Sequence, residues 1–192
     1  MMKKLLCLLA AFVLAGLAGP VSASDITDDE LFGTVEESRY ENAFIGISCD
    51  LEGWTYTSKG ALKYNPGIMV MQAISPNEIS NVNIQARDLR PYTEAPSSDR
   101  DLEAIYDMLP ESLKSSYESR GFRNFQAEKS TIELSGKTIS CLCMSFTAPY
   151  GDACQKEFMY LLNRYLVFVT VTGLSFDETD EILSHFSIHW AE

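Results

Sequence analysis

The most reactive side chains of the sequence are four cysteines that lie beyond its apolar N-terminal run: Cys49, Cys141, Cys143 and Cys154. In an oxidising compartment, four thiols allow three fully paired sets of disulfides. Cys141 and Cys143 are two residues apart in an expected strand, so they share a face at a separation too wide for a comfortable bond. If bridges form, we therefore expect Cys49 or Cys154 to be a partner. Four buried thiols that pack as small apolar groups, and a four-thiolate zinc site, are the alternatives.

Local motifs for catalysis or nucleotide binding are absent from the sequence. It holds no G-x-S-x-G, S-x-x-K or H-E-x-x-H pattern and no glycine-rich phosphate loop. Its two histidines, His185 and His189, could share a metal only on a continuous helix, and the alternating residues 187–190 favour a strand instead. The acidic clusters at 28–30 and 177–181 lack the calcium-loop pattern. Carboxylate pairs remain candidates for hydrolytic chemistry, because glycosidase acids need not be close along the chain.

Aromatic side chains are the other candidates for a functional surface, because tyrosine and tryptophan often anchor a partner. Aromatic residues at predicted strand ends, such as Tyr160, serve equally to close the end of a core. Four tyrosines in or beside predicted loops are the candidate binding residues: Tyr56, Tyr64, Tyr92 and Tyr150.

Composition narrows the class of partner. The 192 residues carry a formal net charge of −12, with 46% hydrophobic and 22% charged residues, which is ordinary for a globular protein. Such acidity argues against a nucleic acid or an anionic membrane surface as the main partner. We expect no cofactor and no metal.

The N-terminal 23 residues have the features of a secretory signal peptide. Lys3 and Lys4 precede an apolar run at residues 5–18, and Pro20 ends it shortly before a predicted cleavage after Ala23. The run is shorter than the roughly 20 residues that span a bilayer, and no second long run follows. We therefore expect no membrane span after cleavage and a location outside the cytoplasm, as a secreted, periplasmic or cell-surface protein.

Short elements that would position these side chains follow from periodicity and turn signals. Residues 24–38 are acidic and form a tail or linker, or a short helix around 28–32, and a single domain is expected over residues 39–192. Alternating apolar residues predict strands at 44–51, 54–57, 68–74 and 82–89.

A long helix and a β-rich half follow. Ser98 and Asp101 form a capping box, and Pro110 predicts either one kinked helix or two abutting ones. Strands are then expected at 122–134, 138–147, 154–162 and 165–172, before a last helix that Ser175 caps. The strand at 165–172 is apolar on both faces and needs cover on both sides. The predicted fold is therefore α+β, a central, mostly antiparallel sheet with helices packed on its faces.

The order of these elements, with a few residues of the first strand and turn, resembles the PsbP-like domains. The residues are Tyr40 and Asn42, Phe44 and Gly46, and Gly53-Trp54. The later helix, the hairpin at Gly136, the meander and the terminal helix agree in order over residues 39–190. The resemblance implies an α/β/α sandwich, shared with the yeast Ran-binding protein of the same superfamily, that acts by binding another protein. It carries over no functional residue.

These observations predict a secreted, non-catalytic binding or accessory domain whose partner is a protein or a component of the cell envelope. The alternatives are a hydrolytic enzyme that uses paired carboxylates and a carrier of a small ligand or metal. A flat aromatic surface would favour the binding domain, and a cleft with two facing acids would favour the enzyme. Cysteines converging around a void would favour the carrier.

Overall fold

The central sheet of the protein has seven antiparallel strands in the order β4-β5-β6-β10-β9-β8-β7. The computed structural model describes residues 27–57, 59–62, 69–90, 92–93, 95–149 and 151–190, so the expected signal peptide lies outside it. The strands are β4 (Thr55–Tyr56), β5 (Met69–Ile74), β6 (Asn81–Asp88), β7 (Arg123–Leu134), β8 (Lys137–Ala148), β9 (Gly151–Leu162) and β10 (Tyr165–Gly173). The four longest follow one another in the chain as a meander.

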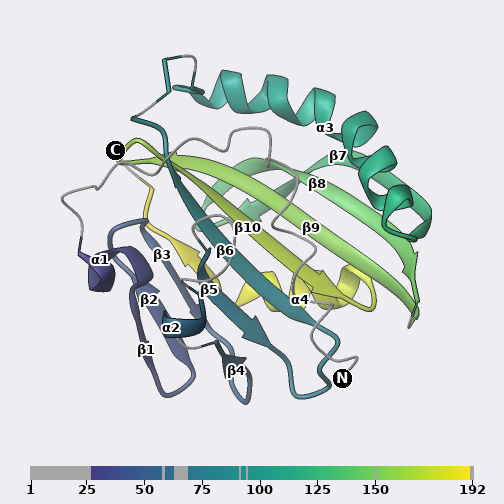
Figure 1. Cartoon of the computed structure of the whole chain (residues 1–192). Coiled ribbons are helices and arrows are strands. Elements are labelled where there is room, and N and C mark those ends of the chain that lie inside the picture. Colours follow the sequence, from purple (N-terminus) through teal and green to yellow (C-terminus); the bar gives the residue numbers. More distant parts are fainter. Residues whose placement is uncertain are drawn as a thin grey trace.

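The two faces of this sheet are covered in different ways (Figure 1). Helix α3 (Asp99–Ser119) packs over β7, β8 and β9 on one face. A second antiparallel sheet, in the order β1-β2-β3-β11, and helix α4 cover the other. The bounds are β1 (Thr34–Glu36), β2 (Arg39–Asn42), β3 (Ile47–Asp50), β11 (Phe186–Ile188) and α4 (Phe176–Ser184). The α+β class and the central antiparallel sheet are confirmed, but the second outer layer is largely β rather than helical.

Part of the acidic N-terminal segment is built into the fold. Helix α1 (Asp28–Phe32) matches the short helix that the sequence suggested, and β1 pairs with β2. Phe32 is buried, and the Asn42 side chain donates a hydrogen bond to the Leu31 carbonyl at 2.9 Å. The described residues of this segment therefore pack against the domain. Another short helix, α2 (Lys59–Leu62), lies beside β5.

Helix α3 forms where the sequence predicts it. Ser98 accepts a hydrogen bond from the Asp101 amide while the Asp101 carboxylate accepts one from the Ser98 amide, which completes the capping box. One helix continues through Pro110, with Leu109 and Leu113 buried on either side of it. An apolar stripe therefore faces the sheet along the whole helix.

Two tight turns fix the geometry of the meander. Ser135 and Gly136 both have positive φ, and so do Asn163 and Arg164, as two-residue type I′ hairpins require. The first turn precedes β8 and the second follows β9. Because β8 and β9 are antiparallel neighbours, the start of β8 and the end of β9 lie at the same end of the sheet.

Within the described part of the chain, we find no helix with both the length and the apolar character that crossing a membrane requires.

Candidate functional site

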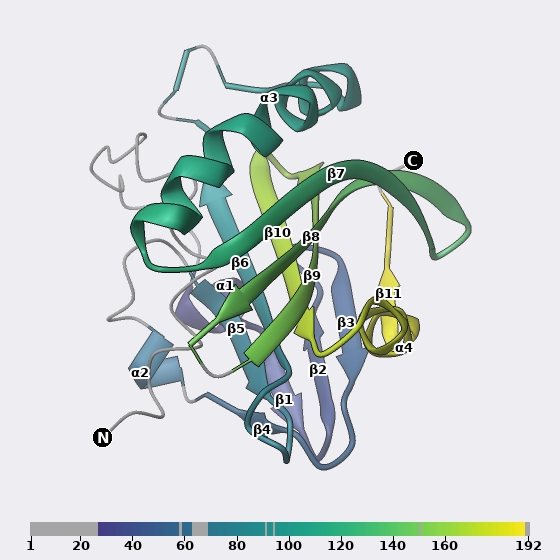
Figure 2. The same cartoon turned by 90° about the vertical axis from the view of Figure 1, so that its right-hand side faces the viewer.

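The central sheet opens at one end between two neighbouring strands. In the described chain, the ladder between β8 and β9 stops at the pair Cys141–Phe158. Residues 137–140 of β8 and 159–162 of β9 continue beyond that pair without bonding to each other. Because β7 stays paired with β8 as far as Lys137, the end of the β7–β8 hairpin curves away from β9 as a unit (Figure 2). We call the opening between residues 137–140 and 159–162 the fork.

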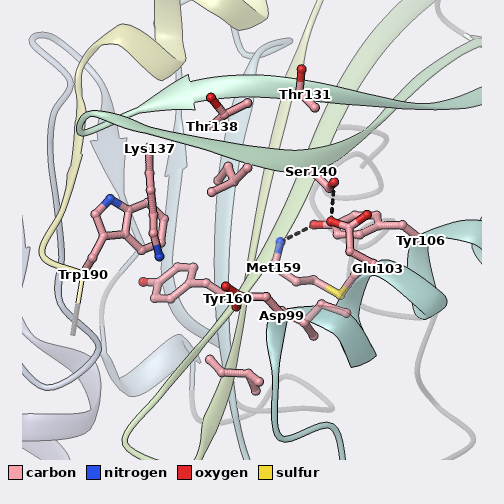
Figure 3. Close-up of a pocket in the computed structure, with 13 residues that line it drawn as sticks. Asp99, Glu103, Tyr106, Thr131, Lys137, Thr138, Ser140, Met159, Tyr160 and Trp190 are labelled. Atoms are coloured by element: carbon pink, nitrogen blue, oxygen red, sulfur yellow. Dashed lines mark hydrogen bonds between the residues drawn. The ribbon is translucent and has the colours of Figure 1, made fainter. Parts of the chain in front are cut away.

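A cavity of about 360 Å³ occupies the fork, a size typical of ligand sites. Thr138, Ile139 and Ser140 line it from β8, and Met159, Tyr160 and Leu161 line it from β9. Figure 3 shows the first turns of α3 closing one side and Trp190, beyond β11, closing the other. Residues from α3, the β7–β8 hairpin, β9 and the segment after β11 thus meet at this cavity.

The amino-acid sequence of β8 explains where the fork begins. Alternate residues that face α3 are Leu142, Met144 and Phe146 in the paired part, and all three are buried. The same face carries Thr138 and Ser140 in the fork, and they are exposed and half-buried. Burial of apolar side chains therefore packs β8 against α3 only from Leu142 onward. The change from polar to apolar residues along this face is visible in the sequence, but the strand prediction did not use it.

Side chains take the place of the missing strand partner. The Met159 amide donates a 2.6 Å hydrogen bond to the Tyr106 hydroxyl of α3. Because backbone groups alternate sides in an antiparallel ladder, those of Met159 and Leu161 face the fork from β9, and those of Thr138 and Ser140 face it from β8. Strand edges with unused backbone groups can pair with another extended chain.

Residues 137–140 of β8 and 159–162 of β9 are the two lips of the fork, and we call the β8 side its outer lip. Glu103 of α3 holds the outer lip in place. One carboxylate oxygen accepts a 2.5 Å hydrogen bond from the Ser140 hydroxyl, and the other lies 2.8 Å from Lys129 Nζ of β7. Lys129 also lies 2.6 Å from Asp107. The hydrogen bonds from Lys129 and then Ser140 lower the pKa of Glu103. This carboxylate is therefore kept ionised and fastens the hairpin to the helix.

Trp190 acts as a wedge at the opposite side of the fork. Its ring meets the Tyr160 ring edge to face, with centroids 5.7 Å apart, and Lys137 Nζ lies 4.9 Å from its centre. The Tyr160 hydroxyl donates to the Ile45 carbonyl at 2.8 Å. The indole nitrogen is buried and has no hydrogen-bond partner among the described residues. The contacts of the Trp190 ring with Tyr160 and Lys137 therefore keep the side chain in this position.

Of the four candidate tyrosines, the two that the structure describes, Tyr56 and Tyr92, do not line this cavity. Tyr56 is half-buried against the core and donates a 2.7 Å hydrogen bond to the Ser38 carbonyl. Tyr92 is half-buried in the loop before α3. Tyr64 and Tyr150 lie outside the described residues. As a binding surface, this set stays a prediction.

The four candidate cysteines are free thiols in two parts of the fold. Cys49 is buried in β3 of the second sheet, and Cys154 is half-buried at the start of β9. Cys141 and Cys143 share one face of β8, as predicted, and their sulfur atoms are 3.9 Å apart. That is closer than the roughly 6.7 Å between alternate Cα atoms of a strand.

Comparison with known proteins shows similarity in fold but no match in sequence. No protein-family model and no curated protein matches the sequence. The solution structure of cyanobacterial PsbP (CyanoP) from Synechocystis sp. PCC 6803 matches 89% of this chain and 100% of its own, with a TM-score of 0.51 and 12% identity. LpqN of Mycobacterium tuberculosis, involved in cell envelope biogenesis, matches 82% of this chain and 88% of its own, with a TM-score of 0.46 and 11% identity. The chain has a PsbP-like fold, and a fold does not by itself fix a function.

Proposed function

We propose that this protein is a non-catalytic, extracytoplasmic binding domain, and that the fork receives an extended segment of a protein partner. The observation that carries the proposal is that two strand edges face each other across a cavity of about 360 Å³ without pairing with each other. An added strand supplies the complementary backbone groups, and side-chain pockets on either side select its sequence.

The lining of the fork suits an extended peptide with mixed side chains. Two residues on each side direct backbone donors and acceptors into the fork, Thr138 and Ser140 from β8 and Met159 and Leu161 from β9, and of these the Met159 amide is bonded to Tyr106. Tyr160 and Trp190 provide aromatic surface beside Lys137, while Asp99 and Glu103 lie on α3. A partner segment with an aromatic or aliphatic residue beside a basic one matches this arrangement.

The acids of the cavity do not support the hydrolytic alternative. Its acidic lining residues, Asp99 and Glu103, are one helical turn apart on the same helix, whereas paired catalytic carboxylates flank a scissile bond from two sides. The lowered pKa of Glu103 is also opposite in direction to that of a general acid. The carrier alternative gains no support from the cavity either, because none of the four cysteines is among its lining residues.

The experiment is a selection of random 12-residue peptides displayed on phage against the exported protein, followed by Kd measurements with soluble copies of enriched peptides. Thr138→Trp fills the fork from an exposed position, and Lys114→Trp places the same bulk on an exposed part of α3 that does not line the cavity. We expect peptides to bind the wild type and Lys114→Trp equally and Thr138→Trp at least tenfold more weakly. Methylation of alternate peptide amides should cost a similar factor, because it removes strand pairing.

Two outcomes would overturn the proposal. One is that repeated selections enrich no peptide above an unrelated protein. The other is that enriched peptides bind all three proteins alike, which would place the site elsewhere on the surface. Circular dichroism of both tryptophan variants shows that they are folded before either outcome is read.

A further inference from the structure

A pair of neighbouring thiols lies in the paired part of β8, starting at the pair where the fork begins and on the face of the sheet opposite α3. Cys141 is fully buried, whereas Cys143 keeps 9% of its surface exposed. Their sulfur atoms are 3.9 Å apart on one face of the strand. The sulfur atoms are thus near each other, but a bond between them also requires the strand to contract locally, because alternate residues of a strand are at the upper limit of separation for a disulfide.

Charges around the pair favour the thiolate at Cys143. In the β8–β9 ladder, Lys156 stands directly opposite Cys143, and its ammonium group lies 2.5 Å from Asp180 of α4. The contact with the Cys141 sulfur and the charge of Lys156 lower the pKa of Cys143 to about 7, against desolvation and the charge of Glu128 on β7. The same pairing raises the pKa of Cys141. The more exposed sulfur is thus the nucleophile of the two.

We propose that Cys141 and Cys143 form a redox pair that exchanges with disulfides of the extracytoplasmic space. The Cys143 thiolate attacks one sulfur of an incoming disulfide, forms a mixed disulfide and releases the other half as a thiolate. Cys141 then loses its proton to that thiolate and attacks the Cys143 sulfur, and the second half leaves as a thiolate. The second thiolate takes up from water the equivalent of the proton that Cys143 released on ionising, so that two thiols of the protein become one disulfide and the incoming disulfide becomes two thiols.

The spacing makes this bond a labile one. Alternate residues of a strand have Cα atoms about 6.6–6.8 Å apart, at the upper limit for a disulfide, so closure pulls on the strand. Strained disulfides are the more easily reduced ones, which is typical of catalytic and regulatory bonds. Cys154 is the competing partner, because it lies one diagonal step from Cys143 across the ladder.

The test uses oxidised glutathione as the disulfide and the reduced, exported protein. After acid quenching, thiols are alkylated and peptide masses identify each bond. We expect the wild type and Cys154→Ser to form the Cys141–Cys143 bond. We expect Cys141→Ser to accumulate a glutathione adduct at Cys143, and Cys143→Ser to leave Cys141 unmodified. A bond between Cys143 and Cys154, or native thiols that stay reduced while the same thiols in guanidinium react, would overturn the proposal.

A second measurement separates a tuned nucleophile from an exposed thiol. The rate of Cys143 alkylation by iodoacetamide should rise with a midpoint near pH 7 in Cys49→Ser/Cys154→Ser protein. Lys156→Met should move that midpoint upward and slow alkylation at pH 7 severalfold, and Lys156→Arg should restore both. A midpoint that Lys156→Met leaves unchanged contradicts the assigned role of Lys156. This proposal does not depend on the fork, so the peptide selection and the thiol assays can fail separately.

Discussion

The two halves of β8 behave differently although they belong to one continuous strand. Residues 141–148 pair with β9, and the side chains from Cys141 to Met144 are all buried, as is Phe146. Residues 137–140 leave β9, and none of their side chains is fully buried. Backbone pairing with β7 runs through both halves and is regular from Ser145 to Lys137, with one register shift near the far end, between Ser145 and Thr147. The difference therefore lies in how much apolar surface each half can bury on the two faces of the sheet.

The open half shows how a sheet can split without losing order. The Tyr106 hydroxyl accepts the Met159 amide hydrogen bond, and the Ser140 hydroxyl is tied to Glu103. At the hairpin turn, Ser135 accepts a 2.7 Å hydrogen bond from the Ile188 amide of β11. Side chains and the C-terminal strand thus support the lips while the cavity between them stays free. A preformed opening costs a partner less ordering than one that must be pulled apart.

The largest expected effect compares two apolar residues of β8 with equal numbers of carbon atoms. Leu142 is fully buried under α3, whereas Ile139 is half-buried at the fork. We expect Leu142→Ala to lower the free energy of unfolding by about 3–4 kcal/mol and Ile139→Ala by about 1 kcal/mol. Urea unfolding followed by circular dichroism measures both. Equal losses would mean that the fork is closed in solution.

A buried acid gives the paired half a pH dependence. Glu157 lies opposite Leu142, and burial raises its pKa from 4.5 to about 7, although Thr170 donates a hydrogen bond to it at 3.2 Å. Between these values, the folded protein holds a proton that the unfolded chain has released. The free energy of unfolding should therefore fall as pH rises from about 4.5 to 7, by up to about 3 kcal/mol, and Glu157→Gln should remove this fall.

The matched control for that experiment is Glu133→Gln, at an exposed position of β7. Unfolding free energies of the three proteins are compared at several pH values between 4.5 and 8, so that the other titrating groups cancel. If Glu157→Gln follows the wild-type pH curve, the carboxyl is ionised inside the fold and the burial argument fails.

The Tyr106 hydroxyl, which bonds the β9 backbone in place of a strand partner, should contribute more to stability than the Tyr117 hydroxyl of the same helix. Tyr106→Phe leaves the Met159 amide without its acceptor, and we expect it to cost about 2 kcal/mol. Tyr117→Phe removes a longer bond, at 3.3 Å to the Gln155 side chain, and should cost about 1 kcal/mol or less. Thermal and urea unfolding rank the two variants. The opposite ranking would show that the Met159 amide bonds elsewhere.

The elements of the fold could be predicted because their signals are local. The capping boxes or caps at Ser98 and Ser175, the turn at Gly136 and the strand periodicities all act within a few residues. The second sheet could not be predicted this way, because β11 pairs with β3 across more than 130 residues of chain. Neither sequence segment carries the identity of its partner.

The candidate site escaped prediction for a similar reason. The aromatic residues chosen from the sequence were those near turns, whereas the cavity is lined by Tyr160, which was expected equally to close the end of a core, and by Trp190. Periodicity predicts where a strand forms, but it does not predict where pairing with the neighbouring strand ends. The polar residues Thr138 and Ser140, in line with Leu142, are the trace that the fork leaves in the sequence.

The smallest expected effect concerns the outer lip of the fork. Ser140→Ala removes the hydroxyl that donates to Glu103, and we expect a loss of about 1 kcal/mol, because the bond is partly exposed. Ser145→Ala, half-buried in the paired half of β8, should cost less than half as much. A double-mutant cycle with Glu103→Gln isolates the coupling of the pair. If Ser140→Ala loses nothing when Glu103 is already replaced, the bond to α3 is what holds the lip. If the two losses simply add, the β7–β8 hairpin keeps its curvature without the helix, and the fork is a property of the sheet alone.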